Sequence, residues 1–123
     1  MGYRSDVGLV LSKKAVAELK RRLDALDNNS NEQTTIRELM EYAQSHYTDK
    51  NSEDEVYYWE WLKWYSDFPD VSFIEKFMAD LEVEDYLFFR VGEEIGDIEI
   101  KGEFWDNPFE FNILQTITLE APR

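Results

Sequence analysis

Residues 56–65 read VYYWEWLKWY, and this run of β-branched and aromatic side chains decides the fold class. Such residues favour strands, because their side chains pack well on a pleated surface. As a strand, the run divides its side chains between two faces, with Tyr57, Trp59 and Trp61 on one and Val56, Tyr58, Leu62 and Trp64 with Glu60 on the other. Bulk on both faces predicts a central strand covered on both sides. A helix remains an alternative, since a short aromatic run cannot be assigned by period alone.

The residues before this run indicate one strand and two helices. Residues 3–11 alternate in a way that places Val7, Leu9 and Leu11 on one face of a strand. Ser12 can then cap a helix whose apolar residues recur every three or four positions, until the DNNSN run at 27–31 ends it. Thr35 and Glu38 have the spacing of a capping box. They predict the start of a second helix, with its apolar face made by Ile36, Leu39, Met40 and Ala43.

The residues after it indicate one more helix and three strands. The polar stretch 48–54 is too short to separate two domains. Asp70 after Pro69 predicts the cap of a third helix that runs to about Leu81. A strand is expected over 86–91, followed by a hairpin turn framed by Gly92 and Gly96. In the next strand Ile98 and Ile100 alternate with charged residues at 97, 99, 101 and 103, which predicts one wet, acidic face. Asn107-Pro108 breaks the pattern, and residues 113–119 supply a last strand.

The elements therefore follow the order β-α-α-β-α-β-β-β. Helices that do not alternate regularly with strands favour the α+β class over a doubly wound sheet. We expect a single domain over residues 1–123, with about three helices packed on an antiparallel-rich sheet of four to five strands.

The composition fits one small core. Hydrophobic residues make up 43% and aromatic residues 15% of the chain, which is enough apolar material to fold despite the charge. There is no cysteine, so disulfides, thiolate zinc sites and cysteine nucleophiles are excluded. Small secreted domains often depend on disulfides. The apolar run at 7–11 is too short for a signal peptide, and no stretch is long enough for a membrane helix. We therefore expect a soluble, cytoplasmic protein that does not bind membranes.

The charge is distributed very unevenly along the chain. The first 50 residues carry eight acidic and eight basic side chains, so the whole net charge of −14 lies in residues 51–123. Five of the bases crowd the first predicted helix: Lys13, Lys14, Lys20, Arg21 and Arg22. The sequence thus predicts an electrically two-sided molecule. Its acidic side should repel nucleic acid and attract a protein with a basic surface, although acidic residues can also serve solubility alone.

Catalytic motifs are weak in this sequence. One alternative is a metal-dependent nuclease or another small hydrolase, in which Asp70, Glu99 and Lys101 converge around a divalent metal. A second is a sugar-cleaving enzyme that uses Glu60 as an acid among Trp59, Trp61 and Trp64. The lone His46 has no cysteine or second histidine with which to bind zinc, and a position at a helix end or on the surface is expected for it. We therefore predict no enzyme, no catalytic residue, no metal site and no cofactor.

The strongest candidate is a partner-binding surface near the C-terminus. Carboxylates spaced along strands and turns can imitate the charges of a nucleic acid backbone, and aromatic residues between them can act as anchors at an interface. Phe104 and Phe109 lie among these carboxylates, with the alternative that they belong to the core. The predicted site comprises Glu93, Glu94, Asp97, Glu99, Glu103, Trp105, Asp106 and Glu110.

Three segments carry a resemblance to known proteins. They are the opening MGYRSDV, the stretch 63–78 with its KWY, FPDV, IE and FM motifs, and FRVGE at 89–93. Together they resemble a group of small, mostly uncharacterised proteins encoded by phages and prophages. The resemblance implies a cytoplasmic accessory protein that acts on a host or phage component, as do acidic phage proteins that inhibit host defence or DNA-processing enzymes, some of them as nucleic-acid mimics. No functional residues are carried over from it. A structural, virion or homo-oligomeric role remains a further alternative.

Overall fold

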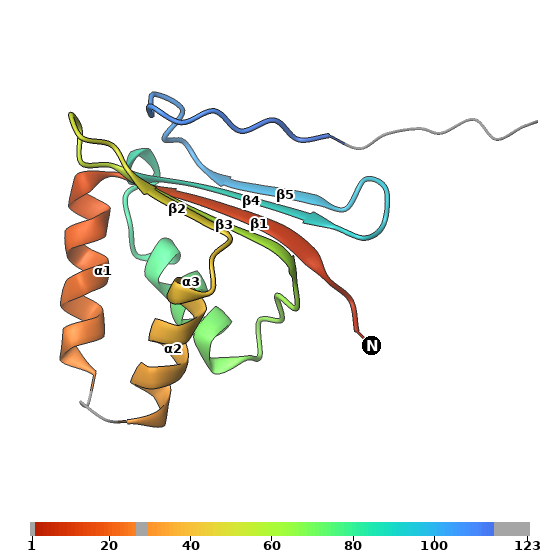
Figure 1. The fold of residues 1–123 in the computed structure, drawn as a ribbon, viewed down its shortest axis with the longest axis horizontal. Helices are drawn as coiled ribbons and strands as arrows, with labels where there is room; N and C mark the ends of the chain where they lie inside the picture. Colours follow the sequence, from red (N-terminus) through yellow and green to blue (C-terminus); the bar gives the residue numbers. More distant parts are fainter. Residues whose placement is uncertain (1, 27–29, 115–123) are drawn as a thin grey trace, which may run out of the picture.

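The computed structural model describes residues 2–26 and 30–114, which form a five-stranded antiparallel sheet with three α-helices against one of its faces (Figure 1). The predicted α+β class is therefore confirmed. The elements, in chain order, are β1 (Ser5–Leu11), α1 (Lys13–Ala25), α2 (Asn31–Glu41), β2 (Ser45–Thr48), β3 (Glu55–Leu62), α3 (Pro69–Ala79), the 3-10 turn η1 (Val83–Asp85), β4 (Tyr86–Gly92) and β5 (Ile98–Gly102).

The sheet has the order β2-β3-β1-β4-β5, so β1 lies at its centre between two hairpins. The predicted element order lacked β2. This strand has four residues, three of them exposed, and it lies at the edge of the sheet, so its sequence carries no apolar alternation. His46 lies on this strand and is exposed, so of its two expected positions the surface is correct and the helix end is not. Its ring stacks on Tyr57 at 4.1 Å, and its Nε2 lies 2.8 Å from a carboxylate oxygen of Glu55.

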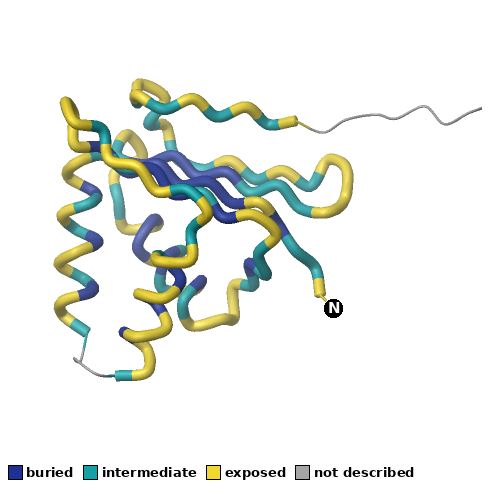
Figure 2. The backbone as a smooth tube through the Cα atoms, in the orientation of Figure 1, coloured by how far each residue is buried: buried dark blue, intermediate teal, exposed yellow. Residues whose placement is uncertain are grey.

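The main core lies between the sheet and the helices (Figure 2). Alternate residues of the three inner strands point into it, and the largest of them, Trp59 and Phe88, are at most 1% exposed. The indole N–H of Trp59 donates a hydrogen bond to the Leu39 carbonyl at 2.8 Å, so its polar atom is satisfied. The helices contribute Ala15, Leu19, Leu23, Ile36, Leu39, Val71, Ile74, Phe77 and Met78.

The helix starts follow capping chemistry, and two of them differ from expectation. Ser12 caps α1 as predicted, since its hydroxyl accepts the N–H of Ala15 at 3.1 Å. The capping box at Thr35 is wrong, because Ser30 caps α2, five residues after α1 ends at Ala25. The Thr35 hydroxyl instead donates to the Asn31 carbonyl one turn back, as threonine inside a helix does. Asp70 is not the cap of α3 either. Phe68 holds that position and Pro69 begins the helix, because a residue without an N–H suits the first turn.

A β-bulge changes the predicted faces of β3. Ser5 pairs with Leu62 and Val7 pairs with Trp59, so three steps along β3 match two along β1. The bulge centres on Trp61, which has φ +55° and is 59% exposed, and the Trp61 N–H donates to the Asp6 carboxylate at 2.9 Å. Because one residue is inserted here, Leu62 and Trp64 turn toward the helices, whereas the sequence placed them on the opposite face.

Residues 103–114, which we call the strap, cross the face of the sheet that the helices leave open (Figure 1). A second, smaller core joins four partly buried strap residues (Phe104, Phe109, Phe111 and Ile113) to Val10, Val56, Leu87 and Phe89. The Phe111 ring lies so close to Gly8 that a β-carbon there would be 2.8 Å from it, so the strap needs glycine at that point of β1. Of the predicted last strand, residues 113–114 are not in a strand and 115–119 lie outside the described residues.

Candidate acidic binding surface

The eight residues predicted to bind a partner fall in three places. Glu93 and Glu94 lie in the turn between β4 and β5, Asp97 directly precedes β5 and Glu99 is its second residue, and the other four belong to the strap. The structure thus brings Glu103, Trp105, Asp106 and Glu110 onto one segment and separates them from the paired carboxylates of the hairpin.

The strap turns its charged residues outward. Glu103, Asp106 and Glu110 are exposed, and within residues 2–26 and 30–114 none of them forms an ion pair. Trp105 is 61% exposed, while one edge of its ring packs against Phe89 with centroids 6.0 Å apart. The strap therefore presents exposed carboxylates and one accessible indole on the same segment.

The other aromatic residues of this region do not reach the surface in the same way. Phe104 and Phe109 are partly buried against the sheet, as the alternative assignment had it. Their role is to hold the strap in place, and Trp105 alone among these three aromatic residues stands on the outer side.

The turn carboxylates are tied to the N-terminal strand. Glu93 accepts the backbone N–H of Arg4 at 2.6 Å, and the Glu94 N–H donates to the Tyr3 hydroxyl at 3.1 Å. Both side chains are exposed. They add negative charge at the far end of the hairpin from the strap's start (Figure 1).

The wet, acidic face predicted for β5 is wrong. Glu99 faces Arg90 across the β4–β5 ladder and accepts its Nε–H at 2.9 Å, while Asp97 accepts the Nη2–H of the same guanidinium at 2.7 Å. Lys101 adds a third cation, 3.1 Å from Glu99. The isoleucines of β5 point to the opposite face and are 40% and 47% exposed. The alternation of isoleucines and charged residues along β5 was predicted correctly. Which of the two faces is exposed to solvent depends on Arg90 of the neighbouring strand, and the β5 sequence alone does not show this arginine.

Arg90 keeps these carboxylates ionised. Its hydrogen bonds, followed by one from the Tyr3 hydroxyl at 2.5 Å, lower the pKa of Asp97 to about 2. Burial by itself would raise the pKa of Glu99, but hydrogen bonds from Arg90 and Lys101 outweigh it and the pKa is lowered. The same pairs raise the pKa of Arg90. Asp97 and Glu99 are thus charged and locally neutralised, and they fasten the hairpin more than they present a charge to a partner.

The two catalytic alternatives find little support in this geometry. Asp70 lies in the first turn of α3, Glu99 is held by two cations, and the described residues hold no group of three or more acidic or histidine side chains able to bind a metal. Trp59 and Trp64 are buried in the main core, whereas Trp61 is exposed at the bulge and Glu60 faces solvent. These tryptophans form no common platform for a sugar.

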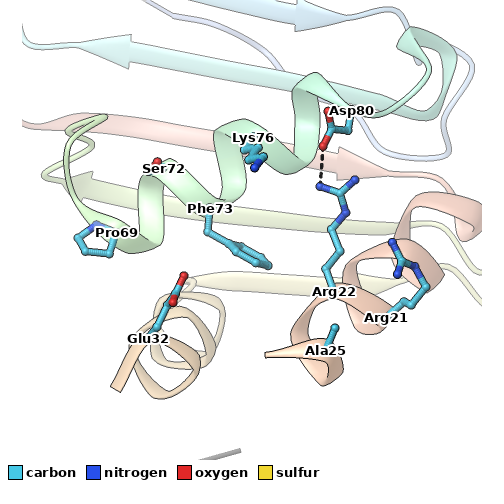
Figure 3. A pocket seen from close by; sticks show the side chains of 9 residues that line it. All are labelled: Arg21, Arg22, Ala25, Glu32, Pro69, Ser72, Phe73, Lys76 and Asp80. Atoms are coloured by element: carbon cyan, nitrogen blue, oxygen red, sulfur yellow. Dashed lines mark hydrogen bonds and ion pairs between the residues drawn. The ribbon is translucent and has the colours of Figure 1, made fainter. Parts of the chain in front are cut away.

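The basic helix lies on the other side of the sheet. Its arginines line a cavity of about 540 Å³ between α1, the start of α2 and α3 (Figure 3). Arg22 forms ion pairs with Glu18 and with Asp80 at 2.8 and 3.0 Å, and hydrogen bonds from Arg21 and Arg22 lower the pKa of Glu18 to about 2. The pairs with Glu18 lie within α1, and the Arg22–Asp80 pair joins α1 to the C-terminal cap of α3. Because α1 and the strap cover opposite faces, the bases of α1 do not neutralise the strap.

Comparison with known proteins adds no family: no family model, no curated protein and no solved structure matches this chain. The resemblance to phage proteins therefore stays a prediction. None of the helices in the part of the chain that the structure describes has both the length and the apolar character needed to span a bilayer.

Proposed function

We propose that this chain is a small accessory protein that binds a protein partner with a basic surface, through the outer side of the strap. One observation carries the proposal: the strap exposes Trp105 together with Glu103, Asp106 and Glu110, and none of these carboxylates forms an ion pair among the described residues. Tryptophan is enriched among the residues that dominate binding energy at interfaces, and unpaired carboxylates attract a basic surface.

The net charge of −14 supports a protein partner more than a nucleic acid. Binding nucleic acid requires cations that neutralise phosphates, and the strap offers the opposite charge. A partner that itself binds nucleic acid or acts in host defence would have the required basic surface. The strap would then compete with the partner's own ligand, which is the inhibitory, mimic-like role that the sequence suggests.

The arrangement of the two faces also supports the proposal. A basic helix next to the strap would cancel its field, but α1 lies beyond the sheet and its main ion-pair partners are Glu18, Glu53, Asp80 and Asp85. The strap's charges therefore act outward, where they increase the rate of encounter with an oppositely charged protein.

A charge-neutral triple variant tests the proposal. The protein is immobilised, and proteins of the source cell are captured on it at roughly 50 and 300 mM salt. Electrostatic screening changes strongly across this range. The yield of each captured protein is then quantified at both salt concentrations. The variant E103Q/D106N/E110Q should lose the salt-sensitive partner, whereas E38Q/E41Q/D67N changes the charge equally at exposed sites elsewhere and should retain it. Equal loss in both variants, or a partner captured equally well at both salt concentrations, contradicts the proposal.

A second candidate function rests on a separate observation. Ile98 and Ile100 are exposed on β5, which is an edge strand, and exposed apolar edges pair with other chains. This favours a homo-oligomer, and light scattering over a range of protein concentrations distinguishes it. A monomeric mass at every concentration excludes it.

A further inference from the structure

A groove separates the strap from the β2–β3 hairpin. One wall is made by side chains of the two strands, Ser45, Tyr47, Val56 and Tyr58, and the other by strap residues Pro108, Phe109, Glu110 and Phe111. The groove has a volume of about 400 Å³. Ser45 pairs with Tyr58 and Tyr47 with Val56, which places all four strand residues on the face of the sheet that the strap crosses.

Aromatic rings dominate this groove, and they remain accessible. Tyr47 is 63% exposed, and Tyr58, Phe109 and Phe111 are only partly buried. The rings of Tyr58 and Phe111 lie 6.5 Å apart at a tilt of 53°, so the groove has a folded aromatic floor. A cation is attracted to the faces of such rings.

The charges around the groove have one sign. Among the described residues that line it, Glu110 is the one carboxylate and none is basic. Burial raises the pKa of the Tyr58 phenol, and the carboxylates of Asp6 and Glu60 raise it further, which indicates a negative potential at this ring. An aromatic floor with a carboxylate at its rim matches a cationic side chain with an apolar stem.

We infer that this groove binds an arginine side chain of the partner. The inference rests on the proposed function and specifies the residue that the partner inserts beside the strap. Arginine fits better than lysine, because its planar guanidinium stacks on aromatic rings and bonds a carboxylate with two parallel N–H groups. The methylene stem would lie along Val56 and Pro108, and the guanidinium would meet Glu110.

A matched pair of small probes tests the inference on the full chain. N-acetylarginine amide and N-acetylcitrulline amide have the same shape and differ in charge, and each is titrated into ¹⁵N-labelled protein. The arginine probe should give saturable shifts at the amides of residues 45–47, 56–58 and 108–111, and the citrulline probe should bind several-fold more weakly. Equal shifts with both probes, or shifts centred on the strap's outer carboxylates at 103 and 106, overturn it. If N-acetyllysine amide binds more tightly than N-acetylarginine amide, the assignment to arginine is overturned.

Two variants separate the groove from general charge effects. Glu110→Gln and Tyr47→Ala should each weaken the arginine probe by roughly three- to fivefold, the size of a solvent-exposed cation–π or ion-pair contact. Glu38→Gln and Tyr42→Ala make the same changes at exposed positions of α2 and its C-terminal cap and should change nothing. If the arginine probe fails while the triple strap variant still loses the partner, the groove is excluded and the proposed function stands. If the arginine probe binds while the triple strap variant still retains the partner, the proposed function is excluded, and with it the claim that the arginine comes from a partner bound at the strap.

Discussion

The two faces of the sheet are built from the same strands and are covered in different ways. On one face, three helices bury tryptophan, phenylalanine and leucine side chains to 8% exposure or less. On the other, a single extended strap covers a smaller cluster of four buried strand residues, and its own apolar side chains are partly buried or exposed. Alternate residues of one strand therefore point either into the core under the helices or toward the strap.

If the proposed function is correct, stability and binding lie on opposite sides of the molecule. Free energy from burial scales with the apolar area removed from water, so the helix-covered face supplies most of it. The strap-covered face retains accessible aromatic residues and unpaired carboxylates, which are the features of a binding surface. The predictions below test that division, beginning with the largest effect.

Removing a ring from the helix-covered core should destabilise the protein most. Phe77→Ala should lower the free energy of unfolding by about 3–5 kcal/mol, because the side chain is completely buried and the cavity cannot collapse fully. Urea unfolding followed by tryptophan fluorescence measures this. Phe109→Ala on the strap is the comparison and should cost about 1–2 kcal/mol, in proportion to its partial burial. If both variants lose the same free energy of unfolding, the two faces of the sheet contribute equally to stability.

Adding one methyl group under the strap should displace it. Gly8→Ala places a β-carbon against the Phe111 ring and should cost about 1–3 kcal/mol through overpacking. Hydrogen exchange should rise in residues 109–114 and stay unchanged in α1 and α3. Adding Phe111→Leu to that variant should recover part of the loss, and a double variant less stable than Gly8→Ala alone would contradict the contact.

The Arg90 network predicts a specific pH dependence. The pKa of Asp97 is lowered from the usual 3.8 to about 2, so its stabilising contribution is complete above about pH 4 and is lost as the pH falls through 2. In Arg90→Gln the pKa should rise back toward 3.8, and in Tyr3→Phe it should rise less, because the arginine is the larger cause. A ¹³C titration of the carboxyl group measures all three values. A native pKa near 3.8 in the unaltered protein would exclude the network.

The bulge at Trp61 predicts the smallest effect. Its φ of +55° is unfavourable for any residue with a β-carbon, so Trp61→Gly should be more stable than Trp61→Ala by about 1 kcal/mol. Both variants lose the exposed indole, and the comparison therefore isolates the backbone. Thermal unfolding of the two variants measures the difference, and equal midpoints would argue against a left-handed residue at this point.

Local signals were enough to predict much of the fold. Ser12 followed by a regular apolar period predicted α1 and its cap, and Gly92 with Gly96 predicted the β4–β5 hairpin. Each of these features depends on side-chain chemistry within a few residues of the chain, which a single sequence contains.

The features that were missed depend on distant residues. β2 is defined by pairing with β3 and not by its own apolar pattern, and the bulge is visible only in the register between β1 and β3. For the candidate site, Trp105 and the carboxylates at 103, 106 and 110 are exposed, as a binding surface requires, and their role in binding stays a prediction. Asp97 and Glu99 do not, because Arg90, on the neighbouring strand, neutralises them.

Hydrogen exchange of the captured complex, compared with the free protein, tests the division between the two faces most directly. We expect new protection in the strap, residues 103–114, and in the β2–β3 hairpin beside it, with α1 and α3 exchanging as before. Protection confined to α1 and α3, with the strap unchanged, would place the partner on the helix side and contradict the account.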